Sequence, residues 1–274
     1  MSSIYLLIIN TNFLVALASF CLYKVSELIF GFHSPYLGYF VFFSTIFAYN
    51  YMRLPFLFQN DNKSIWLHTN KSLIYCILLF SGFSILFLCF FFGIFFFQLL
   101  VPAIVVSVLY PLSITINKKK ISLRNIPFFK IFLISFTWSY VTLLVPIFYF
   151  DITIDYFLIS SFIQRLLFII AISIPFDIRD TQIDKIQTFP NTFGVKASKI
   201  FAFSCLFLLD VLVVIDFITN SITLDYFLAV LLTVELSALI IYFSTANRSF
   251  NFYGILVDSL PIILYIFIVI ISMI

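Results

Sequence analysis

The sequence has little charge. Asp, Glu, Lys and Arg make up only 10 % of its 274 residues, whereas 63 % are hydrophobic and 21 % are aromatic. An ordinary soluble domain carries about 25 % charged residues. So few charges cannot cover a globule of this size, which excludes a water-soluble enzyme or binding module. The many aromatic residues exclude a disordered chain. The formal net charge of +3 is too small to indicate a nucleic-acid partner.

Glycine and cysteine are also scarce. None of the 6 Gly belongs to a phosphate-binding Gly-rich loop. The 4 Cys stand far apart in apolar stretches without a CxxC motif, which excludes a disulfide framework and a cysteine metal site. Neither a Ser-His-Asp arrangement nor an internal repeat is recognisable in the sequence. The composition therefore predicts an integral membrane protein.

Long apolar runs fill most of the chain. A helix needs about 20 mainly apolar residues to cross about 30 Å of hydrocarbon. Nine stretches meet this requirement: 4–28, 35–54, 72–96, 98–116, 127–149, 155–176, 198–217, 222–243 and 253–273. They leave only short connections. We therefore predict an all-α membrane protein, with nine transmembrane helices in one bundle that forms a single domain over residues 1–274.

The basic residues indicate how this bundle is oriented. The connections after the second, fourth, sixth and eighth spans carry almost all of them: Arg53, Lys63, Lys71, Lys118, Lys119, Lys120, Arg124, Lys130, Arg179, Lys185, Lys196, Lys199 and Arg248. The opposite connections carry four Asp and no Lys or Arg. Because cytoplasmic loops are enriched in Lys and Arg, the N-terminus is expected in the cytoplasm and the C-terminus outside. No targeting segment is recognisable, so we expect a bacterial cytoplasmic membrane.

Three carboxylates follow the sixth span in the segment DIRDTQID: Asp177, Asp180 and Asp184. Spacings of three and four place them within about 60° on one helix face. Such carboxylates repel one another and raise each other's pKa unless a cation lies among them. Oxygen ligands suit Mg²⁺, with substrate phosphates filling other positions. We predict a cytoplasm-facing Mg²⁺-diphosphate site. The alternative is a solvated acidic helix end that pairs with the basic side chains around it.

The same segment carries a family resemblance. FDIRDTQID followed by TFPNTFG (residues 188–194) resembles the second aspartate-rich motif of the UbiA superfamily of intramembrane prenyltransferases, a DxxDxxxD helix end followed by Thr-Leu-Pro and Gly. Asn12 resembles the Asn in the family's first helix. One stretch of this sequence resembles the family's basic loop between helices four and five. Its matching residues are Tyr110, Pro111, Lys118, Lys119, Lys120, Leu123, Arg124 and Asn125. The resemblance spans nearly the whole chain and implies nine transmembrane helices.

The resemblance implies a prenyltransferase. Members of the superfamily bind a polyprenyl diphosphate with two Mg²⁺, ionise it to an allylic cation and join that cation to a lipophilic acceptor. It implies that Asp177, Asp180 and Asp184 are the catalytic, magnesium-binding residues. The candidates for binding the diphosphate are Asn50, Arg53, Lys118, Lys119, Lys120 and Arg124.

One family motif is missing. The first motif, NDxxDxxxD, is expected at the end of the second span, where this sequence reads AYNYMRLPF (residues 48–56). Asn50 matches the motif's Asn, but no Asp follows in register. Arg53, with Asn50, could bind the diphosphate in place of a metal; Asp61 could fold back as a ligand; or catalysis is lost and the chain binds an isoprenoid lipid or diphosphate. We predict that the tips of the second and sixth spans line one cavity.

Two charges lie near the middle of predicted spans, Arg165 in the sixth and Glu235 in the eighth. Intramembrane charges are rare and face the bundle interior. Together with Asn12, they are candidates for lining the prenyl channel or for contacting the acceptor's polar group. The favoured alternative is that Arg165 and Glu235 form a structural ion pair between the two helices. A transporter using Arg165, Glu235 and Asp210 is a third class. Since the acids concentrate in one cytoplasmic loop, a diphosphate site is favoured over a transporter.

Overall fold

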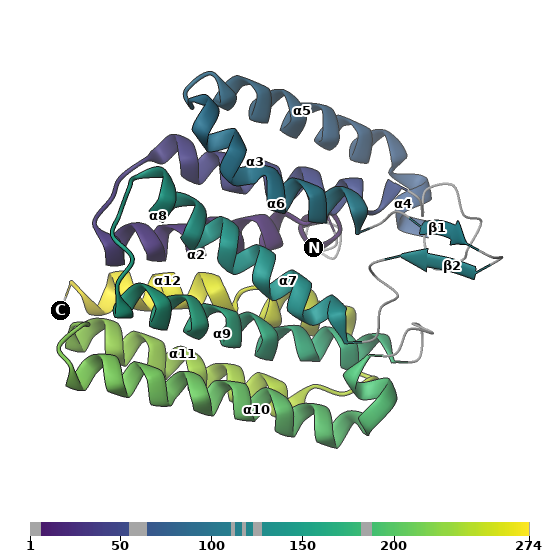
Figure 1. Ribbon diagram of the computed structural model, residues 1–274. Coiled ribbons are helices and arrows are strands. Elements are labelled where there is room, and N and C mark those ends of the chain that lie inside the picture. The colour runs from purple at the N-terminus through teal and green to yellow at the C-terminus, as the bar shows by residue number, and fades with distance from the viewer. Residues whose placement is uncertain are drawn as a thin grey trace.

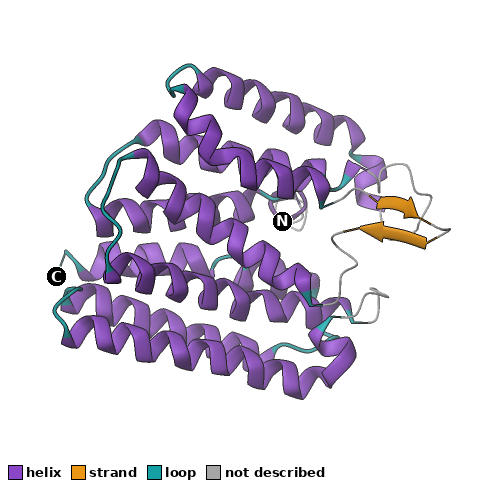
Figure 2. Ribbon diagram, in the orientation of Figure 1, coloured by secondary structure: helices purple, strands orange, loops and turns teal. Residues whose placement is uncertain are grey.

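The computed structural model describes residues 7–54, 65–110, 113–116, 119–122, 128–181 and 188–273. Long helices run side by side in one bundle (Figure 1). The helical elements are α2 (Phe13–Phe30), α3 (Pro35–Tyr51), α4 (Ile65–Thr69), α5 (Lys71–Cys89), α6 (Ile94–Leu109), α7 (Phe129–Ser139), η4 (Tyr140–Leu144), α8 (Val145–Tyr149), α9 (Tyr156–Asp180), α10 (Phe189–Ile218), α11 (Leu224–Phe243), η5 (Phe252–Val257) and α12 (Leu260–Ile271). Strands β1 (Ser113–Ile116) and β2 (Lys119–Ser122) form an antiparallel hairpin at one end (Figure 2).

Seven helical segments of the described chain are long and apolar enough to cross a membrane. The protein is therefore an integral membrane protein with an all-helical bundle. The predicted count of nine spans is not confirmed, because α3 has 17 residues and α6 has 16. The predicted span 98–116 is wrong at its end. The helix stops at Leu109, and the alternating polar and apolar residues 113–116 form a strand.

Polar side chains define where several helices begin. Ser34 precedes α3, where its Oγ accepts a hydrogen bond from a backbone N–H of the first turn, and Pro35 occupies the first helical position. Asp155 precedes α9, and its Oδ1 accepts a bond of 2.8 Å from the N–H of Leu158. These residues satisfy backbone donors that have no partner within the helix. Local side chains thus determine where α3 and α9 begin.

Helix α9 is the central element of the bundle. In its most apolar stretch 61 % of the residues are buried inside the protein, against 17 % in α5. Two large apolar clusters make up the core. One joins α2, α7 and α9 to α10, α11, η5 and α12, and the other joins α2 and the start of α9 to α3, α5, α6, η4 and α8. Because α2 and α9 contribute to both clusters, they hold the two halves of the bundle together.

The predicted first span, 4–28, is interrupted before α2. Asn12 has φ 61°, a left-handed conformation that Asn tolerates better than most residues. The segment before this break packs closely against η5. A Cβ on Gly254 would lie only 2.5 Å from Cγ2 of Ile9, so only glycine allows this approach. The break and the close contact position the N-terminal segment beside the end of α9.

Candidate functional site

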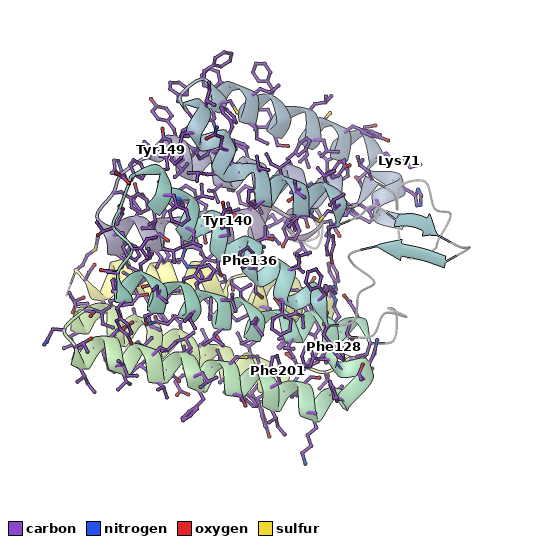
Figure 3. All side chains as sticks on the ribbon, viewed as in Figure 1. Lys71, Phe128, Phe136, Tyr140, Tyr149 and Phe201 are labelled. Carbon is purple, nitrogen blue, oxygen red and sulfur yellow. The ribbon has the colours of Figure 1, made fainter. Side chains whose placement is uncertain are left out.

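A cavity of about 240 Å³ lies at the end of the bundle where α3 and α9 end and α7 begins. In Figure 3 this end carries the labels Lys71 and Phe128, and Tyr149 lies at the opposite end. The chain before α2, together with α2, α3, α7, α9, η5 and α12, surrounds the cavity. Its polar lining residues are Asn12, Tyr49, Arg53, Lys130, Trp138, Ser173, Asp177, Arg179, Asp180 and Asp258. The tips of the second and sixth spans therefore line one cavity, as predicted.

Two of the three predicted carboxylates line this cavity, one turn apart on α9. Lys130 Nζ lies 2.9 Å from Asp177 Oδ1. Arg179 donates two hydrogen bonds to Asp180, from Nε to Oδ1 at 2.7 Å and from Nη2 to Oδ2 at 3.0 Å. Both carboxylates thus have a cationic partner. The pairing of Asp180 with Arg179 agrees with the alternative to a magnesium site, in which the acidic helix end pairs with the basic side chains around it. Asp184 lies outside the described residues.

Asn50 lies in the last turn of α3 and Arg53 lies two residues beyond its end, but only Arg53 lines the cavity. Arg53 Nη1 donates a 2.6 Å hydrogen bond to the carbonyl of Asn10. Asn50 Nδ2 donates to the carbonyls of Thr11 and Ile46 at 3.0 and 2.9 Å. Asn50 therefore fastens the helix break to α3.

A further carboxylate, Asp258, reaches the cavity from the residue after η5. It lies within electrostatic range of Arg53 and Arg179, yet it makes no ion pair with either in the part of the chain that is described. The Arg179 guanidinium also lies over three aromatic rings, 5.3 Å from the centroid of Phe176, 5.4 Å from that of Phe250 and 5.7 Å from that of Tyr253. Ring contacts and the Asp180 pair together fix the position of Arg179.

The wall deeper in the bundle is apolar. Residues Ile131, Ile134 and Trp138 follow Lys130 along α7, while Ile172 and Ile169 precede the carboxylates along α9. Trp138 Nε1 donates a 3.0 Å hydrogen bond to the hydroxyl of Tyr49, which ties α7 to α3. The cavity thus passes from a charged end to an apolar interior. Such a space suits a ligand with an anionic head and a hydrocarbon tail.

Asn12 is the predicted candidate on the first span, and it lines the cavity. It is only 2 % exposed, and its Nδ2 has no hydrogen-bond partner among the described residues. A buried donor without a partner costs free energy. The amide is therefore available to an oxygen of a ligand in the cavity.

The predicted basic loop is only partly described. Lys118 and Arg124, like Asp61, lie outside the described residues. Lys119 and Lys120 belong to β2, where their backbone pairs with Ile116 and Thr115 of β1, and the positions of their side chains are not described. The hairpin stands at the same end of the molecule as the cavity (Figure 1). The diphosphate-binding roles of these residues remain predictions.

The expected ion pair between Arg165 and Glu235 is wrong. Arg165 Nη1 donates to Ser26 Oγ at 2.6 Å and to the carbonyl and Oγ1 of Thr142, both at 3.0 Å. Glu235 is exposed on α11. The buried positions of α11 include 233, 234 and 237, so residue 235 points away from the bundle. Neutral oxygens from α2 and the π-helical segment η4 solvate the guanidinium instead, beside a separate cavity of about 40 Å³.

The sequence did not identify several lining residues as part of the site. From the sequence, Lys130 is only one of the basic residues that indicate the cytoplasmic side. Nothing in the sequence pairs it with Asp177, which lies 47 positions later. Tyr49 and Trp138 lie on different helices, and their contact depends on how those helices pack. Asp258 offers a weak signal, because it is an acid near the basic end of the ninth predicted span.

The carboxylates can be compared with the needs of Mg²⁺. This ion is usually held by one or two carboxylates, with substrate phosphates and water in the other positions. Asp177 and Asp180, on adjacent turns of one helix, match that requirement. Within the described ranges, no cluster of three or more His, Cys, Asp or Glu is arranged to hold a metal ion. The donor set therefore fits Mg²⁺ that is shared with a diphosphate, and does not fit a metal held by these protein groups alone.

Two solved structures share this architecture. A UbiA homologue from Aeropyrum pernix K1 superposes with a TM-score of 0.71 at 11 % sequence identity, over 94 % of this chain and 98 % of that chain. A digeranylgeranylglyceryl phosphate synthase superposes with a TM-score of 0.55 at 19 % identity, over 98 % of each chain. No family model matches the sequence, and no curated protein sequence matches it. The chain thus has the fold of UbiA-type membrane proteins, as the resemblance implied.

Proposed function

We propose that the protein is a membrane prenyltransferase that moves a polyprenyl group from its diphosphate to a lipophilic acceptor. One observation carries the proposal: carboxylates of α9 and cations from α3, α7 and α9 line one end of a cavity whose interior wall is apolar. The shared fold supports it, since one protein with this fold is named a digeranylgeranylglyceryl phosphate synthase. The charged end faces the cytoplasm in this proposal, with the N-terminus also in the cytoplasm of a bacterial cell.

In the proposed reaction, the bond between the prenyl carbon and the diphosphate oxygen breaks, and the electron pair leaves with the diphosphate. The acceptor atom then bonds to the allylic carbon and gives up its proton. Asp177, Asp180 and Asp184 would hold Mg²⁺, which supplies positive charge that stabilises the leaving diphosphate. The cations proposed to contact its oxygens are Arg53, Lys118, Lys119, Lys120 and Arg124, as predicted from the sequence, and the structure adds Lys130 and Arg179 as candidates.

The apolar wall has its own role in this proposal. Ile131, Ile134, Ile169 and Trp138 would surround the first carbons of the prenyl chain and exclude water. Exclusion of water prevents the allylic cation from being captured as an alcohol. Asn12 lines this cavity, whereas Arg165 lines the small separate one and Glu235 is exposed. Of the three predicted acceptor or channel candidates, Asn12 is therefore the one that lies beside the proposed diphosphate site.

The ion pairs favour a second candidate, a non-catalytic protein that binds an isoprenoid lipid or diphosphate. Lys130 and Arg179 already neutralise Asp177 and Asp180, so the charge of both carboxylates is compensated without Mg²⁺. The two candidates differ in turnover. Incubation with geranylgeranyl diphosphate and a membrane lipid extract releases inorganic diphosphate only if the protein is an enzyme.

Binding is the first test of the proposed function. The purified full chain in lipid nanodiscs is titrated with a non-hydrolysable geranylgeranyl diphosphate analogue, with and without Mg²⁺. We expect Mg²⁺-dependent binding that is lost in Asp180→Asn and Asp184→Asn. The matched control is Asp225→Asn, because Asp225 is exposed in the first turn of α11 at the opposite end of the bundle. Absence of binding by the folded parent protein contradicts the proposal.

A further inference from the structure

Arg53 differs from the other cations of the cavity. Lys130 is paired with Asp177 and Arg179 with Asp180, each within 3.0 Å. Arg53 makes no ion pair in the described portion of the chain. Its Nη1 instead donates to a neutral backbone carbonyl. Arg53 is thus the cavity cation whose charge is not matched by a direct carboxylate contact.

The position of Arg53 increases the positive potential of the cavity. Arg53 and Arg179 line the same cavity, where the two guanidinium groups repel each other and Asp258 attracts both. The hydrogen bond to the Asn10 carbonyl holds Arg53 in place despite this repulsion. An anion between the two groups would relieve the repulsion and gain attraction to both.

The two sides of the cavity carry different chemistry. The described residues that line it from before α2, from α2 and from the end of α3 include no acid: they are Ile9, Asn12, Val15, Ala18, Tyr49 and Arg53. All three carboxylates come from the other side, Asp177 and Asp180 from α9 and Asp258 from the residue after η5. A metal ion therefore finds ligands on the α9 side. The α3 side offers hydrogen-bond donors, Arg53 and the Nδ2 of Asn12, which has no hydrogen-bond partner among the residues that the structure describes.

We propose that Arg53 binds a phosphate group of the ligand directly, with Asn12 as a second donor, so that Mg²⁺ is needed only on the α9 side. This inference rests on the proposed function, because it assumes a diphosphate in this cavity. A guanidinium presents paired N–H donors that match two phosphate oxygens. The site would therefore bind one Mg²⁺ for each diphosphate, and the protein would use a fixed side-chain charge where a second metal ion would otherwise be required.

The probe for this inference is inorganic pyrophosphate with Mg²⁺, added to the full chain in nanodiscs. Equilibrium dialysis followed by elemental analysis counts the protein-bound Mg²⁺ per bound pyrophosphate, and we expect one. Calorimetry then compares variants at saturating Mg²⁺. Arg53→Gln is expected to weaken pyrophosphate binding by about 10- to 100-fold, as for the loss of hydrogen bonds to a charged group. Arg53→Lys is expected to fall between Gln and the parent.

Arg248→Gln is the matched control, since Arg248 is exposed and does not line the cavity. It should bind pyrophosphate as the parent does. Two Mg²⁺ per pyrophosphate, or unchanged affinity in Arg53→Gln, overturns the inference and leaves the proposed function standing. No pyrophosphate binding by the parent at any Mg²⁺ concentration overturns both. If Arg53→Gln does not fold, the metal count in the parent protein still decides.

Discussion

The ion pair between Lys130 and Asp177 can be tested by a double-mutant cycle. The two charges are 2.9 Å apart, with side-chain exposures of 16 % and 3 %. Coulomb's law gives an attraction of about 6 kcal/mol at that separation for an effective dielectric constant of about 20, and desolvation offsets much of it. Lys130→Met leaves the Asp177 carboxylate buried without this partner, which should lower the free energy of unfolding by about 3 kcal/mol.

Asp177→Asn should cost a similar amount, because it leaves the Lys130 ammonium without its carboxylate. The double variant should cost less than the sum, with a coupling of about 2 kcal/mol. Reversible SDS unfolding in mixed micelles measures each free energy. Lys71→Met is the control, since Lys71 is exposed at the same end of the bundle. An additive cycle, with coupling below about 0.5 kcal/mol, would refute the reasoning that this pair is a buried interaction.

Two further predictions use the same unfolding assay. Gly254→Ala should lower the unfolding free energy by about 1–3 kcal/mol, because the new methyl group meets a side chain at 2.5 Å; Gly93→Ala, where a Cβ meets nothing within 4 Å, should cost far less, and equal losses would contradict the packing argument. Arg165→Met and Glu235→Gln should combine additively to within about 0.5 kcal/mol, because the two side chains do not meet. A coupling above about 1 kcal/mol would restore the ion pair that the structure contradicts.

The helices of this protein could be predicted because their signal is local. Apolar length alone placed the second span at 35–54 and the eighth at 222–243, close to α3 and α11. The N-terminal break was missed because the predicted span 4–28 ran across the polar residues Asn10, Thr11 and Asn12, where the left-handed φ of Asn12 interrupts the helix. The hairpin was missed because its short alternating strand follows the apolar run of α6 directly.

The candidate site could be predicted only where one segment carries it. The spacing of Asp177 and Asp180 placed both on the side of α9 that lines the cavity. The contacts of Arg165 and Glu235 depend instead on rotation about the helix axes, which equal depth in the membrane does not specify. Since Glu235 lies on the outer face of α11, Arg165 donates its interior hydrogen bonds to neutral oxygens. Pairings across helices require the packed structure.

The short helices α3 and α6 have a consequence for the surrounding lipid. At 1.5 Å per residue, 16 residues of α6 span about 24 Å, which is about 6 Å less than an average hydrocarbon core. Large side chains such as Ile94, Val101 and Ile104 face outward on this helix, so acyl chains contact it directly. If α6 crosses the bilayer, as the sequence predicts, the bilayer is expected to become thinner along this side, at a cost of a fraction of a kcal/mol per Å. Lipids with shorter acyl chains will therefore gather around α6, and the protein will partition toward the thinner regions of its membrane.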